Sequence, residues 1–136
     1  MYPYLVTNLK QVGATIFTEG LGSRACRGEL ADPGESRLGT CHPSESGDIP
    51  IVSLRTAISR IGGHVDLLKL DCEGAEWDIL KDLASFQNVT SIHMEYHLVE
   101  PGQTVEMLID IFRQSGFQSI FIDRNQGFGI AWFKRC

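Results

Sequence analysis

Hydrophobic positions along the chain follow two different spacings. Leu54, Ile58 and Ile61 recur at the spacing of one helical face, whereas residues 65–71 form an apolar run typical of a strand buried in a parallel sheet. The predicted elements are, in order, a helix over 4–12, a strand over 14–18, loops over 22–48 with a weak hairpin at 25–30 and 36–41, a strand over 49–52, a helix over 53–61, a strand over 65–71, a helix over 74–85, a strand over 90–98, a helix from Thr104 through Phe112 closed by Gly116, and strands over 117–122 and 129–133. Strands that alternate with helices predict one open α/β sheet, mostly parallel, that ends in an antiparallel hairpin.

Size and composition fit one folded domain. The chain has 136 residues, of which 43% are hydrophobic and 21% charged, so we expect a single domain over residues 1–136 with a packed core. The net charge of -5 argues against nucleic acid or an anionic membrane as the main partner, because both attract clustered Lys and Arg. No apolar run has the length of a membrane span and residues 1–4 have no signal-peptide pattern, so the expected location is the cytoplasm.

Cysteine and tryptophan residues form no motif of their own. The four cysteines lie at wide, irregular spacings without a Cys-x-x-Cys pair, which predicts free thiols rather than a zinc site or a disulfide framework: Cys26, Cys41, Cys72 and Cys136. Trp77 and Trp132 are expected to be core aromatics.

Acidic residues follow the apolar run at residues 65–71. Asp71 closes the predicted strand, and Glu73 lies in the turn that leads into the next helix. Ligands of open α/β sheets bind beyond the carboxyl ends of the strands, so Asp71 and Glu73 are candidates for chemistry. The alternative is that these acids only complement the positive end of the helix, which is the interpretation we prefer for Glu76 and Asp78.

The next predicted strand, residues 91–98, carries His93, Glu95 and His97 on one face. If it neighbours the first strand, Glu95 and His97 lie beside Asp71 at the same sheet edge. Such a group could transfer a proton or hold a divalent cation, and we favour proton transfer. The alternative is a row of hydrogen-bonded polar side chains, which is our interpretation for His93, while both possibilities stay open for His97.

Four segments of the chain resemble the FkbM-family methyltransferases. Residues 66–76 resemble the family signature, an apolar strand with Lys-hydrophobic-Asp, one variable residue and then Glu-Gly-Ala-Glu. Residues 50–54 resemble the segment before the signature, and residues 94–97 resemble the following strand, where a Glu and a His are usual. Residues 116–117 and the final hairpin resemble the end of the same domain, so the likeness covers most of the chain, from about Val12 to Phe133, in the family's order.

The resemblance implies a Rossmann-like fold and transfer of a methyl group from S-adenosylmethionine to an oxygen of a small-molecule acceptor. By this likeness Asp71 would lie near the reacting methyl group, while the residues that orient the acceptor or act as base would be Glu73, Glu95 and His97. The segment after the third strand would lie near the adenine, which makes the expected cofactor contacts Gly20, Leu21, Gly22, Ser23 and Asp71.

The first two strands of the family and its glycine-rich turn have no counterpart in these residues. That turn gives the cofactor its close backbone approach and a helix N-terminus. We therefore expect an N-terminally truncated form of the fold, which does not bind S-adenosylmethionine by itself. Three hypotheses follow: a methyltransferase whose other half is supplied elsewhere, a non-enzymatic module that dimerises or binds a partner, and a metal-dependent site on Asp71, Glu95 and His97.

Pairing of the strands is a further expectation. Removing strands 1 and 2 from the family order 3-2-1-4-5-7-6 opens an edge of strand 4, and an open edge pairs readily with another strand. Either residues 14–18 lie beside residues 67–71 or, as the alternative we favour, a homodimer forms across this edge. We also expect residues 67–71 and 92–98 to be adjacent parallel strands, with residues 117–122 and 129–133 antiparallel to each other.

Overall fold

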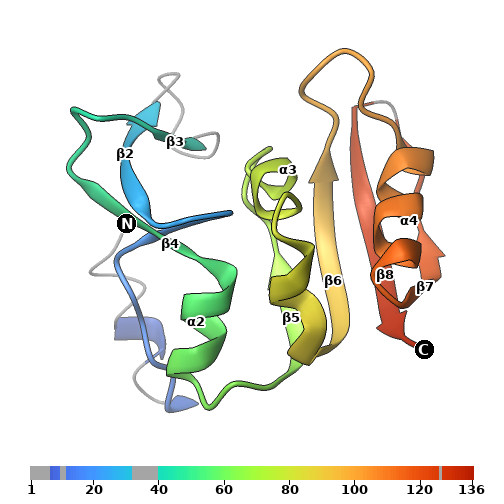
Figure 1. Cartoon of the computed structure of the whole chain (residues 1–136), viewed down its shortest axis with the longest axis horizontal. Coiled ribbons are helices and arrows are strands. Elements are labelled where there is room, and N and C mark those ends of the chain that lie inside the picture. The colour runs from blue at the N-terminus through green and yellow to red at the C-terminus, as the bar shows by residue number, and fades with distance from the viewer. Residues whose placement is uncertain (1–6, 10–11, 32–39, 126) are drawn as a thin grey trace.

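The computed structural model describes residues 7–9, 12–31, 40–125 and 127–136, and it confirms the α/β class (Figure 1). The elements are, in order, β1 (Gly20–Gly22), β2 (Cys26–Ala31), β3 (Thr40–Pro43), β4 (Ile49–Ser53), α2 (Leu54–Arg60), β5 (Val65–Leu70), α3 (Glu76–Ile79), the 3-10 helix η2 (Leu83–Asn88), β6 (Val89–His97), α4 (Val105–Gln114), β7 (Phe117–Ile122) and β8 (Phe128–Arg135). None of the helices in the described ranges is both long enough and apolar enough to cross a membrane.

The strands form two mixed sheets, which corrects the prediction of one mostly parallel sheet. The first sheet has the order β1-β4-β2-β3 and the second the order β5-β6-β8-β7. Among the described strands, β1–β4 and β5–β6 pair in parallel and the other four pairs are antiparallel. The reason is that each sheet receives a hairpin: β2–β3 returns beside β4, and β7–β8 returns beside β6. The Rossmann-like arrangement and the single domain remain predictions.

The second sheet confirms the predicted pairing. β5 and β6 are adjacent and parallel, with Leu68 opposite Ile92 and Leu70 opposite Met94. β7 and β8 are antiparallel, with a register shift between Ser119 and Phe121. The order β5-β6-β8-β7 also corresponds to the 4-5-7-6 portion of the strand order that the family resemblance implies.

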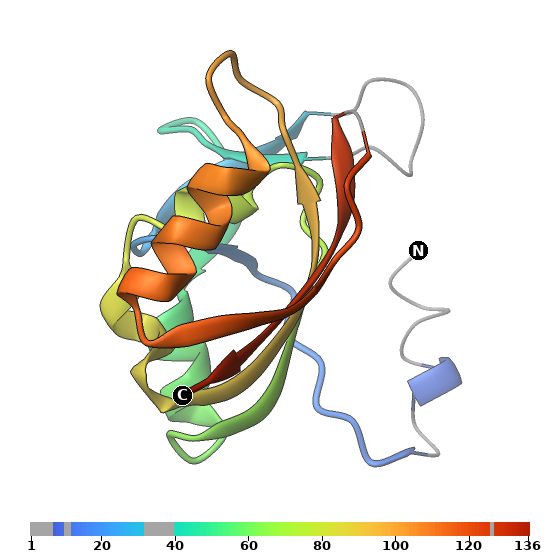
Figure 2. The same ribbon diagram turned by 90° about the vertical axis from the view of Figure 1, so that its right-hand side faces the viewer.

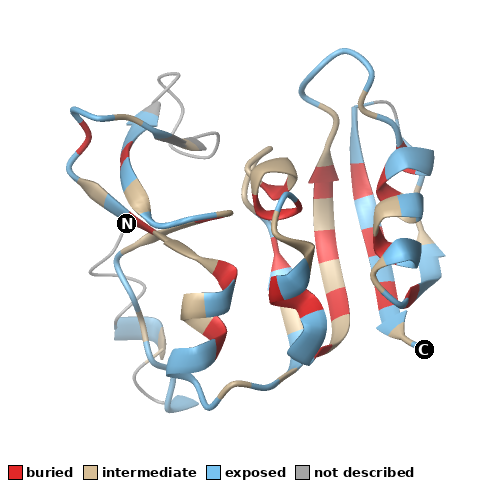
Figure 3. Ribbon diagram, viewed as in Figure 1, coloured by how far each residue is buried: buried red, intermediate tan, exposed pale blue. Residues whose placement is uncertain are grey.

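One face of the second sheet carries the core. Figure 2 shows that α4 covers this face, and α2 and η2 lie on the same side. Thr104 caps α4, as predicted, and its side-chain oxygen accepts the N–H of Met107. Phe112 of this helix stacks on Phe133 of β8 with ring centroids 4.2 Å apart. Alternate residues of β6 are buried beneath it, as Figure 3 shows, namely Ile92, Met94 and Tyr96.

Three predicted elements differ or lie partly outside the described residues. Residues 14–18 form no strand and do not pair with β5, because the chain first pairs at β1, which joins β4. The predicted helix over 74–85 is divided, since Asp82 leaves helical geometry (φ -108°, ψ 71°) and its carboxylate accepts the Ser85 hydroxyl. Of the predicted helix over 4–12, residues 7–9 are helical, and residues 4–6, 10 and 11 lie outside the described ranges.

The opposite face of the second sheet is exposed. Trp132 was predicted in the core, but half of it is exposed (50%), because the register of β8 turns it away from α4 and edge-on to His93. Other apolar side chains are exposed on the same sheet: Leu67, Phe121, Phe128 and Ile130. On the side away from β6, no described strand pairs with β5. An unpaired edge next to exposed apolar residues is a site for strand addition.

The first sheet is tied to α3 by a hydrogen-bonded carboxylate. The Asp78 side chain accepts the backbone N–H of Ser23 at 3.0 Å and the Nζ of Lys81 at 3.1 Å. Burial raises the pKa of Asp78, but the hydrogen bonds from Ser23 and Lys81 outweigh it, and the pKa lies below its ordinary value of 3.8. Ionised Asp78 therefore stabilises the contact between β1 and α3.

We expect the chain to form a homodimer through β5. Leu67 is 63% exposed on this edge strand, so Leu67→Lys should leave the monomer folded while placing a charge on the edge that would pair. Size-exclusion chromatography with light scattering at tens of micromolar should give the dimer mass for the wild type and the monomer mass for the variant. A monomeric wild type would contradict the prediction.

We also expect acid to weaken the contact between β1 and α3. A carboxyl group with a lowered pKa in the folded state stabilises fully above its unfolded pKa, and this contribution is lost as the pH falls through the folded pKa. In urea unfolding, Asp78→Asn should lower the free energy of unfolding at neutral pH and reduce its fall below about pH 4. Asp48→Asn, at an exposed position, is the control and should keep the wild-type dependence on pH.

Candidate functional site

The turn between β5 and α3 has a backbone that restricts which residues can occupy it. Glu73 and Gly74 both have positive φ, 53° and 103°. A Cβ atom on Gly74 would lie 2.9 Å from Cγ1 of Val99, so glycine is needed both for the backbone angle and for the space. A glutamate in this left-handed region is uncommon, and such conformations concentrate at functional sites.

Glu76 is the buried centre of this turn. Its side-chain oxygens accept the N–H of Cys72 at 2.6 Å and the N–H of Gly74 at 2.9 Å, while the residue is fully buried. Glu76 lies in the first turn of α3, as the interpretation at the helix end assumed, and it also accepts the N–H groups of the turn before the helix. Burial raises the pKa of the adjacent Cys72 thiol, and the carboxylates of Glu76 and Asp71 raise it further, so Cys72 is a neutral thiol.

The His97 imidazole lies among three carboxylates. Its Nε2 atom is 3.3 Å from Glu73 Oε2 and 3.7 Å from Glu95 Oε1. Its Nδ1 atom is 3.6 Å from Oε2 of the buried Glu76, and it is buried without a hydrogen bond within the described residues. One nitrogen therefore faces the interior and the other faces the more exposed Glu73 and Glu95.

Two aromatic residues fix the end of β6 that carries His97. The indole Nε1–H of Trp77 donates to the backbone oxygen of His97 at 2.6 Å, which links α3 to β6. Phe128 lies opposite His97 on β8, and the two rings are stacked with centroids 6.3 Å apart. The imidazole is thus positioned from both neighbouring elements, with only 16% of its side chain exposed.

Asp71 has a different partner from the one predicted. Its carboxylate accepts Lys69 Nζ at 2.7 Å on the exposed side of the sheet, whereas Glu95 and His97 approach each other. Of the expected group of Asp71, Glu95 and His97, only Glu95 and His97 therefore approach each other. No group of three or more His, Cys, Asp or Glu side chains in the described ranges is arranged to hold a metal ion, so the metal-dependent hypothesis receives no support.

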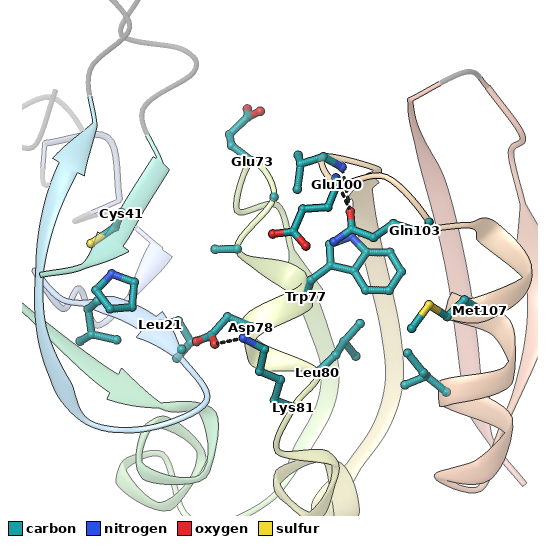
Figure 4. A pocket seen from close by; sticks show the side chains of 18 of the residues that line it. Leu21, Cys41, Glu73, Trp77, Asp78, Leu80, Lys81, Glu100, Gln103 and Met107 are labelled. Carbon is teal, nitrogen blue, oxygen red and sulfur yellow. Dashed lines mark hydrogen bonds and ion pairs between the residues drawn. The ribbon is translucent and has the colours of Figure 1, made fainter.

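A cavity of about 750 Å³ extends over α3 next to this cluster (Figure 4). Leu21 and Gly22, two of the predicted cofactor contacts, line it, and Glu73 lines it as well as contacting His97. Gly20 and Ser23 are not among the residues that line it. Ser23 instead donates to Asp78, so its backbone N–H is already used within the protein. A role for residues 20–23 in cofactor binding remains a prediction.

Sequence reasoning missed two residues that organise the site. Glu76 was attributed to the helix end, although an acid two residues after a glycine in a strand-to-helix turn is placed to accept the N–H groups of that turn. Trp77 was assigned to the core, where it is partly buried, but its indole N–H also holds the His97 backbone. An indole donor usually finds an acceptor when buried, and this was the available signal.

Comparison with known proteins identifies one family. A family model described as the methyltransferase FkbM domain matches residues 20–119, a range that contains the turn at residues 71–76 and His97. No curated protein and no solved structure gave a significant match. Because the matched residues are more than half of the chain, the chain belongs to the FkbM methyltransferase domain family.

Proposed function

We propose that the chain activates the acceptor in methyl transfer to a hydroxyl oxygen, with His97 as the general base. The observation that carries the proposal is the placement of one imidazole between a buried carboxylate at Nδ1 and two more exposed carboxylates at Nε2. A neutral imidazole accepts a proton at one ring nitrogen while it keeps a proton on the other, which suits it to remove a proton from a hydroxyl group.

The proposal requires the tautomer of His97 that carries its proton on Nδ1, the nitrogen on the side of the buried Glu76. That tautomer would leave the lone pair on Nε2, which faces Glu73 and Glu95. The acceptor hydroxyl would donate to Nε2 as its oxygen becomes nucleophilic. The carboxylates of Glu73 and Glu95 would then stabilise the imidazolium that forms, in the way that a third group supports the base in nucleophilic catalysis.

S-adenosylmethionine, which the family implies, would supply an electrophilic methyl group on sulfur. By the family likeness Gly20–Gly22 would lie near its adenine, whereas its methionine end would need the glycine-rich turn that has no counterpart in these residues. A Cβ on Gly22 would lie 3.0 Å from both Asp78 and Ile51, so the protein itself fills the space that this glycine leaves. We therefore propose that the cofactor is held mainly by a part of the enzyme that these residues do not supply, such as another chain.

We expect the 136-residue chain to bind S-adenosylmethionine no better than about millimolar, roughly -4 kcal/mol, and to transfer no methyl group by itself. The few contacts available must offset the free energy lost on immobilising the ligand. Titration calorimetry with S-adenosylmethionine and S-adenosylhomocysteine measures this affinity. A micromolar dissociation constant for either ligand would contradict the prediction, and loss of that affinity in Asp71→Ala would then place the cofactor at Asp71.

We expect neutral His97 to carry its proton on Nδ1. Long-range ¹H–¹⁵N spectra, recorded well above the ordinary histidine pKa of about 6.5, distinguish the two tautomers. In Glu76→Gln the amide NH₂ replaces one acceptor oxygen, so the Nδ1–H form should decrease and the protein should lose about 1–3 kcal/mol of stability. The control Glu95→Gln changes the Nε2 side and should keep the Nδ1–H form. An Nε2–H tautomer in the wild type would leave no lone pair for the acceptor and would exclude the base role.

A further inference from the structure

We propose that the cavity over α3 binds the apolar body of the acceptor and selects acceptors that are neutral or cationic. This inference rests on the proposed function, because it places the reacting hydroxyl near Glu73. Of the residues around His97, Glu73 lines the cavity, whereas His97, Glu76 and Glu95 do not. Glu73 lies 3.3 Å from His97 Nε2 and is therefore the contact between the cavity and the proposed base.

The walls of the cavity are mainly apolar. Figure 4 shows Trp77 and Met107 at the α4 end and Leu21 at the opposite end, beside the first sheet, where Ile51 also lines the cavity. A volume of about 750 Å³ lies within the range of pockets that bind small molecules. An aromatic ring or a branched alkyl body would therefore replace water against these surfaces, and the Trp77 indole offers a face for stacking.

The charges at the cavity are mostly negative. Three carboxylates, Glu73, Asp78 and Glu100, and one ammonium group, Lys81, line it. Lys81 is paired with Asp78 at 3.1 Å, so this pair contributes little net charge. No ion pair within the described residues involves the Glu100 side chain. An anionic acceptor would meet like charge here, and like charge is an effective way to reject a ligand.

The segment that carries Glu100 is held in place. The side-chain oxygen of Gln103 accepts the N–H of Val99 at 2.8 Å and the N–H of Glu100 at 3.0 Å. Val99 also packs against Gly74 of the turn. The backbone that carries Glu100 is therefore held next to the turn that carries Glu73, and both carboxylates line the same cavity.

Three small probes with one body and different head groups test the proposal: 2-phenylethanol, 2-phenylethylammonium and phenylacetate. The Trp77 indole N–H signal reports binding in ¹H–¹⁵N spectra, and Trp132→Phe identifies it because these are the only two tryptophans. We expect the ammonium and the alcohol to shift this signal in a saturable way, with phenylacetate at least about tenfold weaker than the ammonium.

Variants at the cavity and away from it complete the test. Glu100→Gln should reduce the preference for the ammonium over phenylacetate several-fold, whereas Glu106→Gln, at an exposed position of α4 that does not line the cavity, should not. Met107→Trp should weaken all three probes by filling the space, with the other amide signals showing that the fold is kept. The proposal is overturned if phenylacetate binds as tightly as the ammonium, if no probe shifts the Trp77 signal, or if Met107→Trp leaves the affinities unchanged.

The outcome is independent of the test of the base. Selective binding with an Nε2–H tautomer at His97 would retain the cavity and remove the proposed chemistry. An Nδ1–H tautomer without selective binding would retain the chemistry and remove the cavity as the acceptor site.

Discussion

The hydrogen bonds that Glu76 accepts from Cys72 and Gly74 hold the turn on which the candidate site depends. A carboxylate with no exposed surface is costly to bury unless its oxygens are satisfied, and the turn satisfies them with two backbone N–H groups. The backbone N–H groups of Cys72 and Gly74 also need an acceptor, and Glu76 provides it. From this arrangement Glu76 faces inward toward His97 Nδ1, while Glu73 reaches Nε2 from the other side.

Residues in or directly after the same turn contact the first sheet, the second sheet and the segment that leads into α4. α3 follows directly after it and carries Asp78, which binds Ser23 of the first sheet, and Trp77, which binds the end of β6. Val99, at the start of the segment before α4, packs on Gly74. The cavity lies where these parts meet, so its shape depends on contacts that are far apart in the sequence.

Local patterns predicted the second sheet well. The alternation along β6, the cap at Thr104 and the terminal hairpin depend on neighbouring residues, and all three are present. The division into two sheets was not predictable in this way, because it depends on whether β4 pairs with β1 and β2 or with β5. The exposure of Trp132 was not predictable either. Both faces of β8 carry apolar residues, so the sequence does not show which face is buried.

The candidate site was predictable in its members but not in their roles. Glu73, Glu95 and His97 lie together because parallel neighbours end at one sheet edge, which strand order alone implies. The surroundings of the two neighbouring acids were not predictable from the pattern: Asp71 pairs with Lys69, whereas Glu76 is buried and accepts two N–H groups of the turn.

Gly74 and Glu76 are needed for the fold of the turn, whatever part Glu76 takes in the chemistry, and this changes how the family signature should be interpreted in other sequences. A descendant that has lost its chemistry would still need both residues to close the turn, so their retention is no measure of activity. The side chains of Glu95 and His97 accept no backbone N–H group of that turn, so the stability of the turn does not require them. Under the proposed role of His97 as the base, replacements at these two positions among relatives would be the better sign of a pseudoenzyme, and an intact Glu-Gly-Ala-Glu segment beside them would record its descent from an enzyme.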